Sequence, residues 1–430
     1  MYLTGWSAAL ALVGVIPAYV THSRGVAWLW VLGVLALAGL DALLAPSVTR
    51  VAVRRTVPSA VRLTESTAST LEVVNLTERT VHGAVRDAWP PSAGAGANRH
   101  RFHLEGHTST SGVTPLRPTR RGDLPAAAVT VRLEGPLRLA GRQRSLSVPT
   151  RLRVLPEFAS RKHLPARLAR LREMDGLSPI MMRGAGSEFD SLREYVIGDD
   201  VRTIDWRASA RRADVVVRTF RPERDRRVII LVDTARLSAT RVDGAPRLEA
   251  SIEAALLMSA LASHAGDRVQ VIAYDRVERA RAMGTSHATV MPAVAQALAV
   301  IEPSLVEPDW PGAVRLIHER VSQRALIVLA TTVDAAMIDS GALRAIAVLQ
   351  RDHQVLVASV EDPETTAMLH GRGSVEGVFT AAAAARESLE RDGIVARVRL
   401  TGAEVVMAPP DAVAPAVADA YLALKAAGRL

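Results

Sequence analysis

The 430-residue sequence contains no cysteine. This absence excludes disulfide bonds, cysteine nucleophiles and thiolate metal sites together, and it fits a chain that folds in a reducing compartment. Hydrophobic residues make up 49% of the chain and charged residues 23%, which excludes a disordered or collagen-like protein. The length predicts two or three domains and is sufficient to bury at least one full core.

The sequence also lacks a concentrated basic run, although its formal net charge is +9. Arginine is spread through the whole chain, which indicates a generally solvated, arginine-rich surface. We therefore expect no nucleic-acid partner. An acidic partner or an anionic lipid surface is the alternative that the positive charge leaves open.

Charge is nearly absent from two stretches close to the N-terminus. Leu3–Val20 has no charged residue, and Val26–Ala45 has only Asp41. Each is close to the roughly 20 residues that a helix needs to cross a hydrocarbon core. A cleaved signal peptide does not fit, because no Lys or Arg precedes the first stretch and no small-residue cleavage site follows it. Residues 1–48 therefore predict a transmembrane helical hairpin.

The arginines around this hairpin predict its orientation in the cell (plasma) membrane. The short connection between the two stretches holds Arg24, whereas Arg50, Arg54 and Arg55 closely follow the second. Positive charge resists translocation, so the long C-terminal part should be cytoplasmic, with the N-terminus on the same side. We expect a multi-pass protein whose C-terminal domains lie in the cytoplasm.

Residues 51–156 show a different pattern. Short β-prone segments such as Thr70–Leu76 and Ala127–Leu133 alternate with clusters of Gly, Pro, Ser and Arg. Short strands separated by turn signals predict a small β-rich, sandwich-like domain.

Three histidines of this region, His100, His103 and His107, lie close together in the sequence with Glu105. On a strand, His103 and His107 would face one side and His100 the other. This spacing does not match the usual patterns of metal ligands, so we interpret them as ordinary surface histidines.

From Arg227 onward the pattern becomes regular, and residues 227–430 predict a C-terminal α/β domain. Apolar runs of strand length occur at Val228–Val232, Val269–Ala273, Ala325–Ala330, Gln354–Val360 and Glu404–Met407. Helical stretches lie between and after them, at Arg247–His264, Thr289–Ile301, Pro311–Val321, Ala342–Arg351, Ala381–Arg391 and Asp411–Ala427. Continuous apolar strands that alternate with helices predict a doubly wound parallel sheet.

No glycine-rich phosphate loop follows any of these strands, which excludes a dinucleotide-binding or P-loop enzyme. The first strand is followed by Asp233. Because ligands of such sheets bind beyond the carboxyl ends of the strands, Asp233 marks the first place to look for a site.

The order of elements and the aspartate after the first strand resemble a von Willebrand factor A-type domain. In that family a D-x-S-x-S loop, a Thr and a second Asp bind a divalent ion such as Mg²⁺, which a partner's carboxylate completes. Here Ala235 and Leu237 occupy the two serine positions, and the second aspartate would fall at Thr332 or, after a shift, at Asp334. Asp233 alone supplies too few fixed oxygens. We therefore expect a degenerate metal site and no cofactor, with Asp233 instead capping the following turn.

Residues 157–226 contain the most distinctive sequence. It reads GAGSEFDSLREYVIGDDVRTIDWRASAR over 184–211 and VVRTFRPE over 216–223. This signature closely resembles that of the domain of unknown function 58 family, bacterial proteins typically found alongside MoxR-type AAA+ ATPases. The two membrane helices, Arg120–Gly122 in the β-rich region, the A-type domain and the terminal Tyr421–Leu430 also match the family's layout.

The resemblance implies a membrane-tethered partner of a MoxR-type ATPase that helps to assemble, activate or mature other proteins. No reaction is established for the family, so we expect no enzyme activity. We predict a protein-binding adaptor or scaffold whose further partners are the lipid bilayer and client proteins. A metal-dependent adhesion or ligand-binding A-type domain and an uncharacterised hydrolase are the alternatives.

The candidate residues of the signature are acidic, basic and aromatic. They are Glu188, Phe189, Arg193, Glu194, Tyr195, Gly198, Asp199, Arg202, Asp205, Trp206, Arg211 and Glu223. Arginine–carboxylate pairs among them could clamp the segment to the A-type domain. Alternatively, their Arg, Tyr and Trp side chains could form a docking surface.

Between these two interpretations we expect a mixed result. Asp205 and Trp206 would be structural, whereas Arg193, Tyr195 and Arg202 would lie nearer the partner. A hydrolase would use Asp199, Asp205 or Glu223 as acid and base, but the sequence shows no positioned nucleophile or metal beside them.

Overall fold

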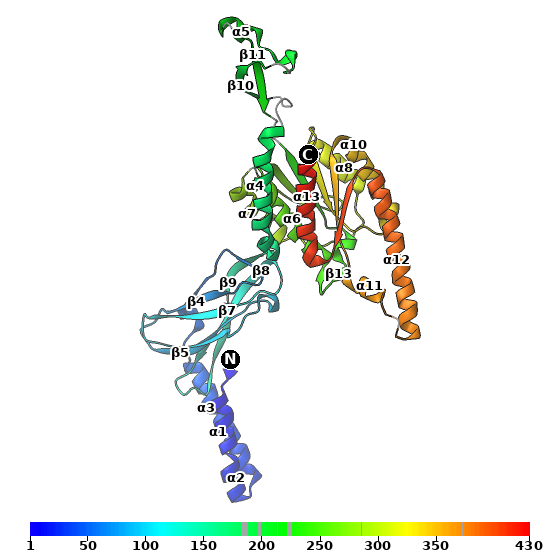
Figure 1. Ribbon diagram of the computed structural model, residues 1–430. Helices are drawn as coiled ribbons and strands as arrows, with labels where there is room; N and C mark the ends of the chain where they lie inside the picture. The colour runs from blue at the N-terminus through cyan, green and yellow to red at the C-terminus, as the bar shows by residue number, and fades with distance from the viewer. Residues whose placement is uncertain (182–187, 197–198, 213, 222–225, 285, 372) are drawn as a thin grey trace. The chain divides into compact units, whose positions relative to one another are not determined.

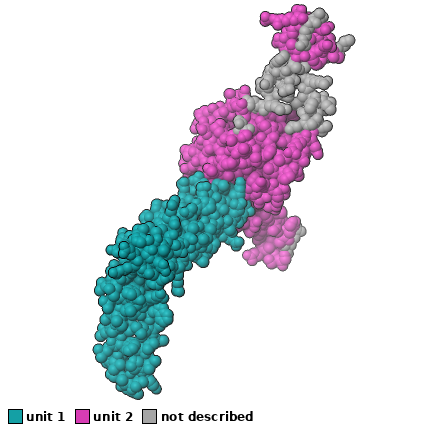
Figure 2. Space-filling model, turned by 90° about the vertical axis from the view of Figure 1, so that its left-hand side faces the viewer, with its two compact units in different colours: residues 1–157 teal, residues 158–430 magenta. Residues whose placement is uncertain are grey.

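The structure is a computed structural model that describes residues 1–181, 188–196, 199–212, 214–221, 226–284, 286–371 and 373–430. The chain divides into two compact units, Met1–Glu157 and Phe158–Leu430 (Figure 2). Each unit is a mixture of strands and helices, so the chain as a whole is a mixed α/β protein.

The first unit begins with three apolar helices, α1 (Gly5–Val13), α2 (Val15–Thr21) and α3 (Arg24–Leu44) (Figure 1). Among the described residues, one helical segment, Arg24–Arg50, is long and apolar enough to cross a membrane. Gly5–Thr21 is a shorter apolar helix. The structure therefore supports the second of the two predicted spans by length and composition, whereas the first falls short of that criterion.

A close approach between Gly14 and Trp30 shapes this part of the chain. A Cβ atom at Gly14 would lie 2.0 Å from Cδ1 of Trp30, so a larger residue would displace the indole. The indole Nε1 of Trp30 donates a hydrogen bond of 2.9 Å to the carbonyl oxygen of Leu10. Because this contact joins α3 to α1, the three helices form a hairpin that turns between Thr21 and Arg24.

Two sheets form the β-rich part of the first unit. Their strands are β1 (Tyr2–Leu3), β2 (Val51–Thr56), β3 (Ala60–Arg62), β4 (Thr67–Asn75), β5 (Val81–Asp87), β6 (Arg99–Leu104), β7 (Ser109–Leu116), β8 (Gly122–Glu134) and β9 (Ala140–Leu155). One sheet has the order β1-β9-β8-β5-β6 with β3 beside β9, and the other has the order β2-β4-β7. Side chains from both sheets, such as Leu71, Val73, Val129 and Val131, share one buried core, as in a sandwich.

Both ends of the helical hairpin are attached to this sandwich. At the N-terminus, β1 pairs antiparallel with β9. Near the end of α3, the carboxylate of Asp41 accepts hydrogen bonds from the backbone N–H groups of Leu137, Leu139 and Ala140 at 2.7–2.9 Å. Asp41 is fully buried, so the charge that interrupts the second apolar stretch faces the β8–β9 turn and not lipid.

The second unit is built around a six-stranded sheet. Its strands are β12 (Arg227–Asp233), β15 (Arg268–Tyr274), β16 (Glu278–Gly284), β17 (Leu326–Ala330), β18 (Gln354–Val360) and β19 (Glu404–Ala408). Their order is β16-β15-β12-β17-β18-β19. All neighbours pair in parallel except β15 and β16, which are antiparallel.

Helices cover both faces of this sheet (Figure 1). The helices of the unit are α4 (Leu164–Met181), α5 (Trp206–Arg212), α6 (Arg247–His264), α7 (His287–Ala299), α8 (Trp310–Arg320), α9 (Ala336–Asp339), α10 (Ala342–Asp352), α11 (Pro363–Met368), α12 (Val375–Leu400) and α13 (Pro410–Ala426). Residues of α8, α10 and α12 share one core with Ile229, Leu231 and Ile327. Helices α6, α7 and α13 contact strands of the sheet and one another.

Four shorter strands complete the second unit. They are β10 (Glu188–Glu194), β11 (Val216–Arg221), β13 (Arg241–Val242) and β14 (Ala245–Pro246). β10 pairs antiparallel with β11, and β13 pairs antiparallel with β14.

Several elements have the bounds that the sequence predicts, notably β18 and α6. The sequence pattern missed β16, whose residues Glu278–Gly284 alternate charged and small side chains. Such alternation is typical of an edge strand, which is covered on one side only and needs no continuous apolar run.

Candidate functional site

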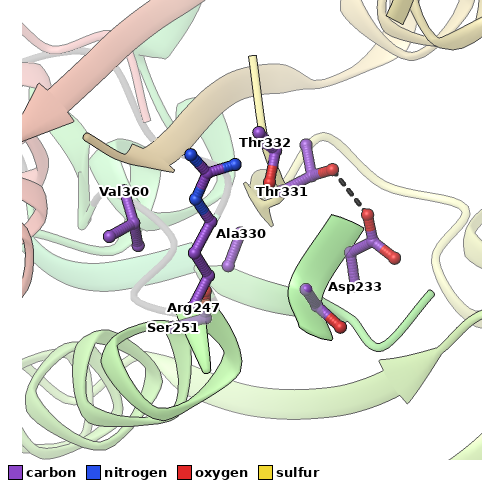
Figure 3. Close-up of a pocket in the computed structure, with 8 residues that line it drawn as sticks. Asp233, Arg247, Ser251, Ala330, Thr331, Thr332 and Val360 are labelled. Carbon is purple, nitrogen blue, oxygen red and sulfur yellow. Dashed lines mark hydrogen bonds between the residues drawn. The ribbon is translucent and has the colours of Figure 1, made fainter. Parts of the chain in front are cut away.

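Asp233 lies at the carboxyl edge of the sheet, where β12 ends. Its Oδ2 accepts a hydrogen bond of 2.6 Å from the hydroxyl of Thr331 (Figure 3). Its Oδ1 accepts one of 2.8 Å from the backbone N–H of Ala235. Burial raises the pKa of this carboxyl, although these two hydrogen bonds oppose the shift. Both oxygens thus hold the turn after β12 and the end of β17, which is the geometry of the turn-capping interpretation.

Thr332 lines the same small pocket as Asp233, and the charge of Asp334 helps to raise the pKa of Asp233, but neither side chain is hydrogen-bonded to the Asp233 carboxylate among the described residues. Thr331, and not Thr332, contacts its carboxylate. Asp334 lines an adjoining pocket, where burial raises the pKa of its carboxyl. Within the described residues, no group of three or more His, Asp or Glu side chains is arranged to hold a metal ion.

A second buried aspartate, Asp275, lies next to this edge, at the end of β15. It accepts hydrogen bonds from Arg279 at 2.8 Å and from Ser304 at 2.7 Å, in addition to the N–H groups of Arg276 and Val277. Burial alone would raise the pKa of Asp275, but these donors outweigh it and lower the pKa to about 2. Asp275 is therefore a fixed negative charge that further raises the pKa of Asp233.

A pocket of about 230 Å³, open to solvent, occupies the same edge beyond β17, β18 and β19. Arg247, the first residue of α6, extends past the ends of β17 and β18 and lies between Thr332 and Val360 (Figure 3). Burial lowers the pKa of its guanidinium. The other charged residues that line the pocket are Asp334, Glu387, Glu390 and Arg391.

Thr331, Arg247 and Arg391 were not predicted as site residues from the sequence. Thr331 directly follows β17, so the rule that places ligands at carboxyl ends could have found it. Arg247 and Arg391 belong to helices, and neither residue stands in a recognisable motif.

The signature sequence forms a hairpin, which we define as β10, β11 and α5 with their described connections. The register pairs Glu188 with Arg221 and Phe189 with Phe220. Gly198 and Glu223, which the sequence also proposed, lie outside the described residues.

Asp205 organises the hairpin. Its Oδ1 accepts hydrogen bonds from the N–H groups of Ala208 at 2.9 Å and Arg207 at 3.1 Å, and thus caps α5. Its Oδ2 accepts one of 2.8 Å from Arg218 of β11. The N–H of Ala208 and the guanidinium of Arg218 lower the pKa of Asp205. The carboxylate of Asp205 therefore connects α5 to β11 within the hairpin.

Arg193 forms the second ion pair of the hairpin. Its guanidinium contacts Asp199 at 2.5 Å, and this hydrogen bond raises the pKa of Arg193. Asp199 also accepts a hydrogen bond of 2.9 Å from the N–H of Val196. This pair links β10 to the connection that follows it, so Arg193, which was expected near the partner, also has a local structural contact.

Trp206 differs from the expectation. It does not lie beneath the ion pairs, because 69% of its surface is exposed. Arg202, Arg211 and Glu194 are exposed as well, whereas Tyr195 is half-buried. Within the described part of the hairpin, the ion pairs Arg193–Asp199 and Arg218–Asp205 join residues of the hairpin itself, and Arg202 is exposed.

The three histidines of the first unit do not converge. His100 contacts the hydroxyl of Thr114 at 2.9 Å, whereas His103 pairs with His82 of the adjacent strand at 2.7 Å between their Nδ1 atoms. His107 lies in a turn with a φ of 59°.

Comparison with known proteins identifies a family for part of the chain. Residues 191–391 match the sequence profile of the family described as "Protein of unknown function DUF58". No curated protein matches the chain.

Solved structures resemble only part of the chain. The CARDB domain of a Pyrococcus furiosus protein is 13% identical, with a TM-score of 0.20 over 26% of this chain and 91% of that one. A protein of unknown function from Porphyromonas gingivalis W83 is 17% identical, with a TM-score of 0.20 over 25% and 49% of the two chains. A FixG-related protein from Vibrio parahaemolyticus is 11% identical, with a TM-score of 0.17 over 24% and 96%. TM-scores this low support no inference about the fold or the function of this chain.

Proposed function

Because residues 191–391 match the DUF58 family model, we propose that the chain is a membrane-anchored adaptor that binds other proteins. In this proposal it partners a cytoplasmic MoxR-type AAA+ ATPase in the assembly, activation or maturation of client proteins. The observation that carries the proposal is the exposed surface of the signature hairpin.

This surface combines apolar and cationic side chains. Val196, Val201 and Trp206 are exposed by 61%, 63% and 69% respectively. The exposed arginines Arg202 and Arg211 belong to the same hairpin. Tryptophan and arginine dominate the binding energy of many protein interfaces, and exposed apolar residues next to them are typical of a docking surface.

The small size of the hairpin also supports a binding role. An isolated two-stranded hairpin is at best marginally stable in water. The contacts of Asp205 and of the Arg193–Asp199 pair hold its backbone and leave Trp206 and Arg202 outside. A partner that covers these side chains would supply the apolar contacts that the hairpin itself lacks.

The strand order of the second unit supports the finer proposal of a doubly wound, von Willebrand factor A-type domain. Five parallel strands with one antiparallel edge strand, β16, and helices on both faces fit that architecture. Asp233 uses both oxygens within its own domain, which favours a binding protein without a metal ion over a metal-dependent adhesion protein.

We further propose that the helical hairpin crosses the membrane twice and leaves the later domains in the cytoplasm. The pairing of β1 with β9 and the contact of Asp41 with the β8–β9 turn support a hairpin with both ends on the side of the sandwich. The arginines that follow α3 favour the cytoplasm for that side.

The proposal is tested by capture of a purified MoxR-type ATPase from the same organism on the full chain in detergent micelles. Arg202→Ala and Trp206→Ala should each weaken capture about 30-fold, the effect of losing roughly 2 kcal/mol at an interface hot spot. Both residues are exposed, so their melting temperatures should stay close to that of the wild type.

The matched control is Arg386→Ala, which removes an exposed arginine from α12 and should capture the ATPase normally. Normal capture by both Arg202→Ala and Trp206→Ala, with unchanged melting, would refute the docking role of the hairpin.

A further inference from the structure

Three buried polar atoms that lack a hydrogen-bond partner belong to residues lining one pocket. They are Nε of Arg247, Nε of Arg391 and Oδ1 of Asp334. Buried polar groups in folded proteins are nearly always hydrogen-bonded, and each exception needs an explanation. Two donors and one acceptor without partners at the carboxyl edge of a sheet indicate a site that is completed by a ligand.

The pocket receives these groups from three separate elements. Arg247 comes from the start of α6, Asp334 follows β17, and Arg391 lies on α12. Its volume of about 230 Å³ is smaller than that of a typical ligand pocket and suits the last residue of a peptide, whose remaining residues would lie outside it.

Three carboxylates near Arg247 raise the pKa of its guanidinium, against the larger effect of burial, but within the described residues none forms an ion pair with it. They belong to Asp334, Asp362 and Glu387. Among the described residues, neither Arg247 nor Arg391 forms an ion pair within 4.0 Å. Glu390, which also lines the pocket, pairs instead with Arg386 at 2.9 Å. A half-buried guanidinium without an acceptor is unfavourable, so each side chain gains free energy by turning toward an acceptor that enters the pocket.

The charged side chains that line the pocket restrict the chemical class of ligand that it can bind. A planar guanidinium binds a carboxylate through two parallel hydrogen bonds, and two of them converge here. The carboxylates of Asp334, Glu387 and Glu390 disfavour a doubly charged anion such as phosphate. The unpartnered oxygen of Asp334 requires an N–H donor close to the bound carboxylate.

We propose that this pocket binds the free carboxyl terminus of a polypeptide. Arg247 and Arg391 receive the terminal carboxylate, and Asp334 accepts the N–H of the last peptide group. A polypeptide C-terminus carries both groups on one residue, which an acidic side chain does not. The proposed site lies at the carboxyl edge of the sheet and does not depend on the ATPase or on the signature hairpin.

The test uses the full chain in detergent micelles and a rhodamine-labelled pentapeptide library of random sequence with free C-termini. Fluorescence anisotropy should show saturable binding. The same library with amidated C-termini should bind at least tenfold more weakly, because it lacks the carboxylate. Arg247→Gln and Arg391→Gln should each weaken binding of the free library at least tenfold, and Asp334→Asn should weaken it to a smaller extent.

Arg397→Gln is the matched control, because it removes an exposed arginine from the same helix as Arg391 and should leave binding unchanged. Circular dichroism melting identifies any variant that fails to fold, and the two arginine variants on different helices provide independent tests. Equal binding of the free and amidated libraries would overturn the proposal in favour of side-chain carboxylates. Absence of saturable binding to the wild type, or wild-type binding by both arginine variants, would overturn it as well.

Discussion

At the scale of single residues, Arg55 is a buried charged side chain whose hydrogen bonds stabilise the core of the sandwich. Its guanidinium donates hydrogen bonds to Asp87 at 2.9 Å and to the carbonyl oxygens of Ala126, Val148 and Ala128 at 2.6–2.9 Å. The side chains of Arg55 and Asp87 have no exposed surface. The pairing of β8 with β9 shifts register between Ala126 and Ala128, so Arg55 satisfies carbonyl groups beside a β-bulge.

Removal of one partner from this buried pair should strongly destabilise the first unit. Asp87→Ala leaves the charge of Arg55 uncompensated, so the free energy of unfolding should fall by roughly 3–5 kcal/mol. Arg54→Ala removes the neighbouring exposed arginine of the same strand and should change it by less than about 0.5 kcal/mol. Denaturant unfolding of the full chain in detergent measures both values. Equal stability of the two variants would contradict the structural role of the pair.

Asp275 should make the stability of the second unit depend on pH. Its pKa is about 2 in the folded chain, below the ordinary value of 3.8. A carboxyl with a lowered pKa stabilises the fold above its unfolded pKa, and this stabilisation is lost as the pH falls through the folded pKa. Asp275→Asn should therefore lower the free energy of unfolding by about 1–2 kcal/mol at pH 7. The deficit should shrink as the pH falls from 3.8 toward 2.

Unfolding of the wild type and of Asp275→Asn between pH 2 and pH 7 checks this difference. Asp339→Asn, at an exposed position of α9, is the control and should follow the wild type at every pH. A deficit for Asp275→Asn that stays constant down to pH 2 would mean that its charge has no part in stability.

At the scale of elements, the signature hairpin depends on a helix cap. α5 has only seven residues and is therefore too short to be stable in isolation. Asp205 caps it and joins it to β11 through Arg218. Asp205→Ala should thus release both contacts, and the backbone N–H groups of residues 206–212 and 216–221 should exchange with deuterium faster than in the wild type.

The control for this element is Asp214→Ala, which alters an exposed carboxylate between α5 and β11. In Asp214→Ala, hydrogen exchange in the hairpin should stay at the wild-type rate. In β12, exchange should stay at the wild-type rate in both Asp205→Ala and Asp214→Ala. Unchanged exchange in Asp205→Ala would show that the cap does not maintain the hairpin.

At the scale of the whole molecule, the absence of cysteine permits a direct test of membrane topology. A cysteine introduced at His22, between α2 and α3, should react with a membrane-impermeant maleimide in intact cells if the hairpin crosses twice. Thr49→Cys, after α3, should react only once the membrane is permeabilised. A reporter fused after Leu430 should behave as cytoplasmic. Failure of His22→Cys to react from outside would exclude a second crossing, and an external reporter would exclude the orientation and the ATPase partnership together.

Much of the second unit could be predicted from sequence because its strands are buried on both faces. The predicted apolar strand Gln354–Val360 is β18, with the same bounds in the structure. The predicted helix Arg247–His264 is α6, again with the same bounds. The first unit was harder. β9, which covers Ala140–Leu155, carries many arginines and was not recognised, because one face of a sandwich strand meets solvent and tolerates charge.

The sequence by itself determined the resemblance of residues 191–391 to the DUF58 family, the alternation of strands and helices and the apolar segments at the N-terminus, because each depends on residues that are close together in the chain. Only the tertiary structure decided the surroundings of individual polar side chains. It joined Asp233 to Thr331, enclosed Asp41 and Arg55, left Trp206 exposed, and brought Arg247 and Arg391 into one pocket. These contacts join segments far apart in the sequence, and local periodicity carries no information about which segments meet.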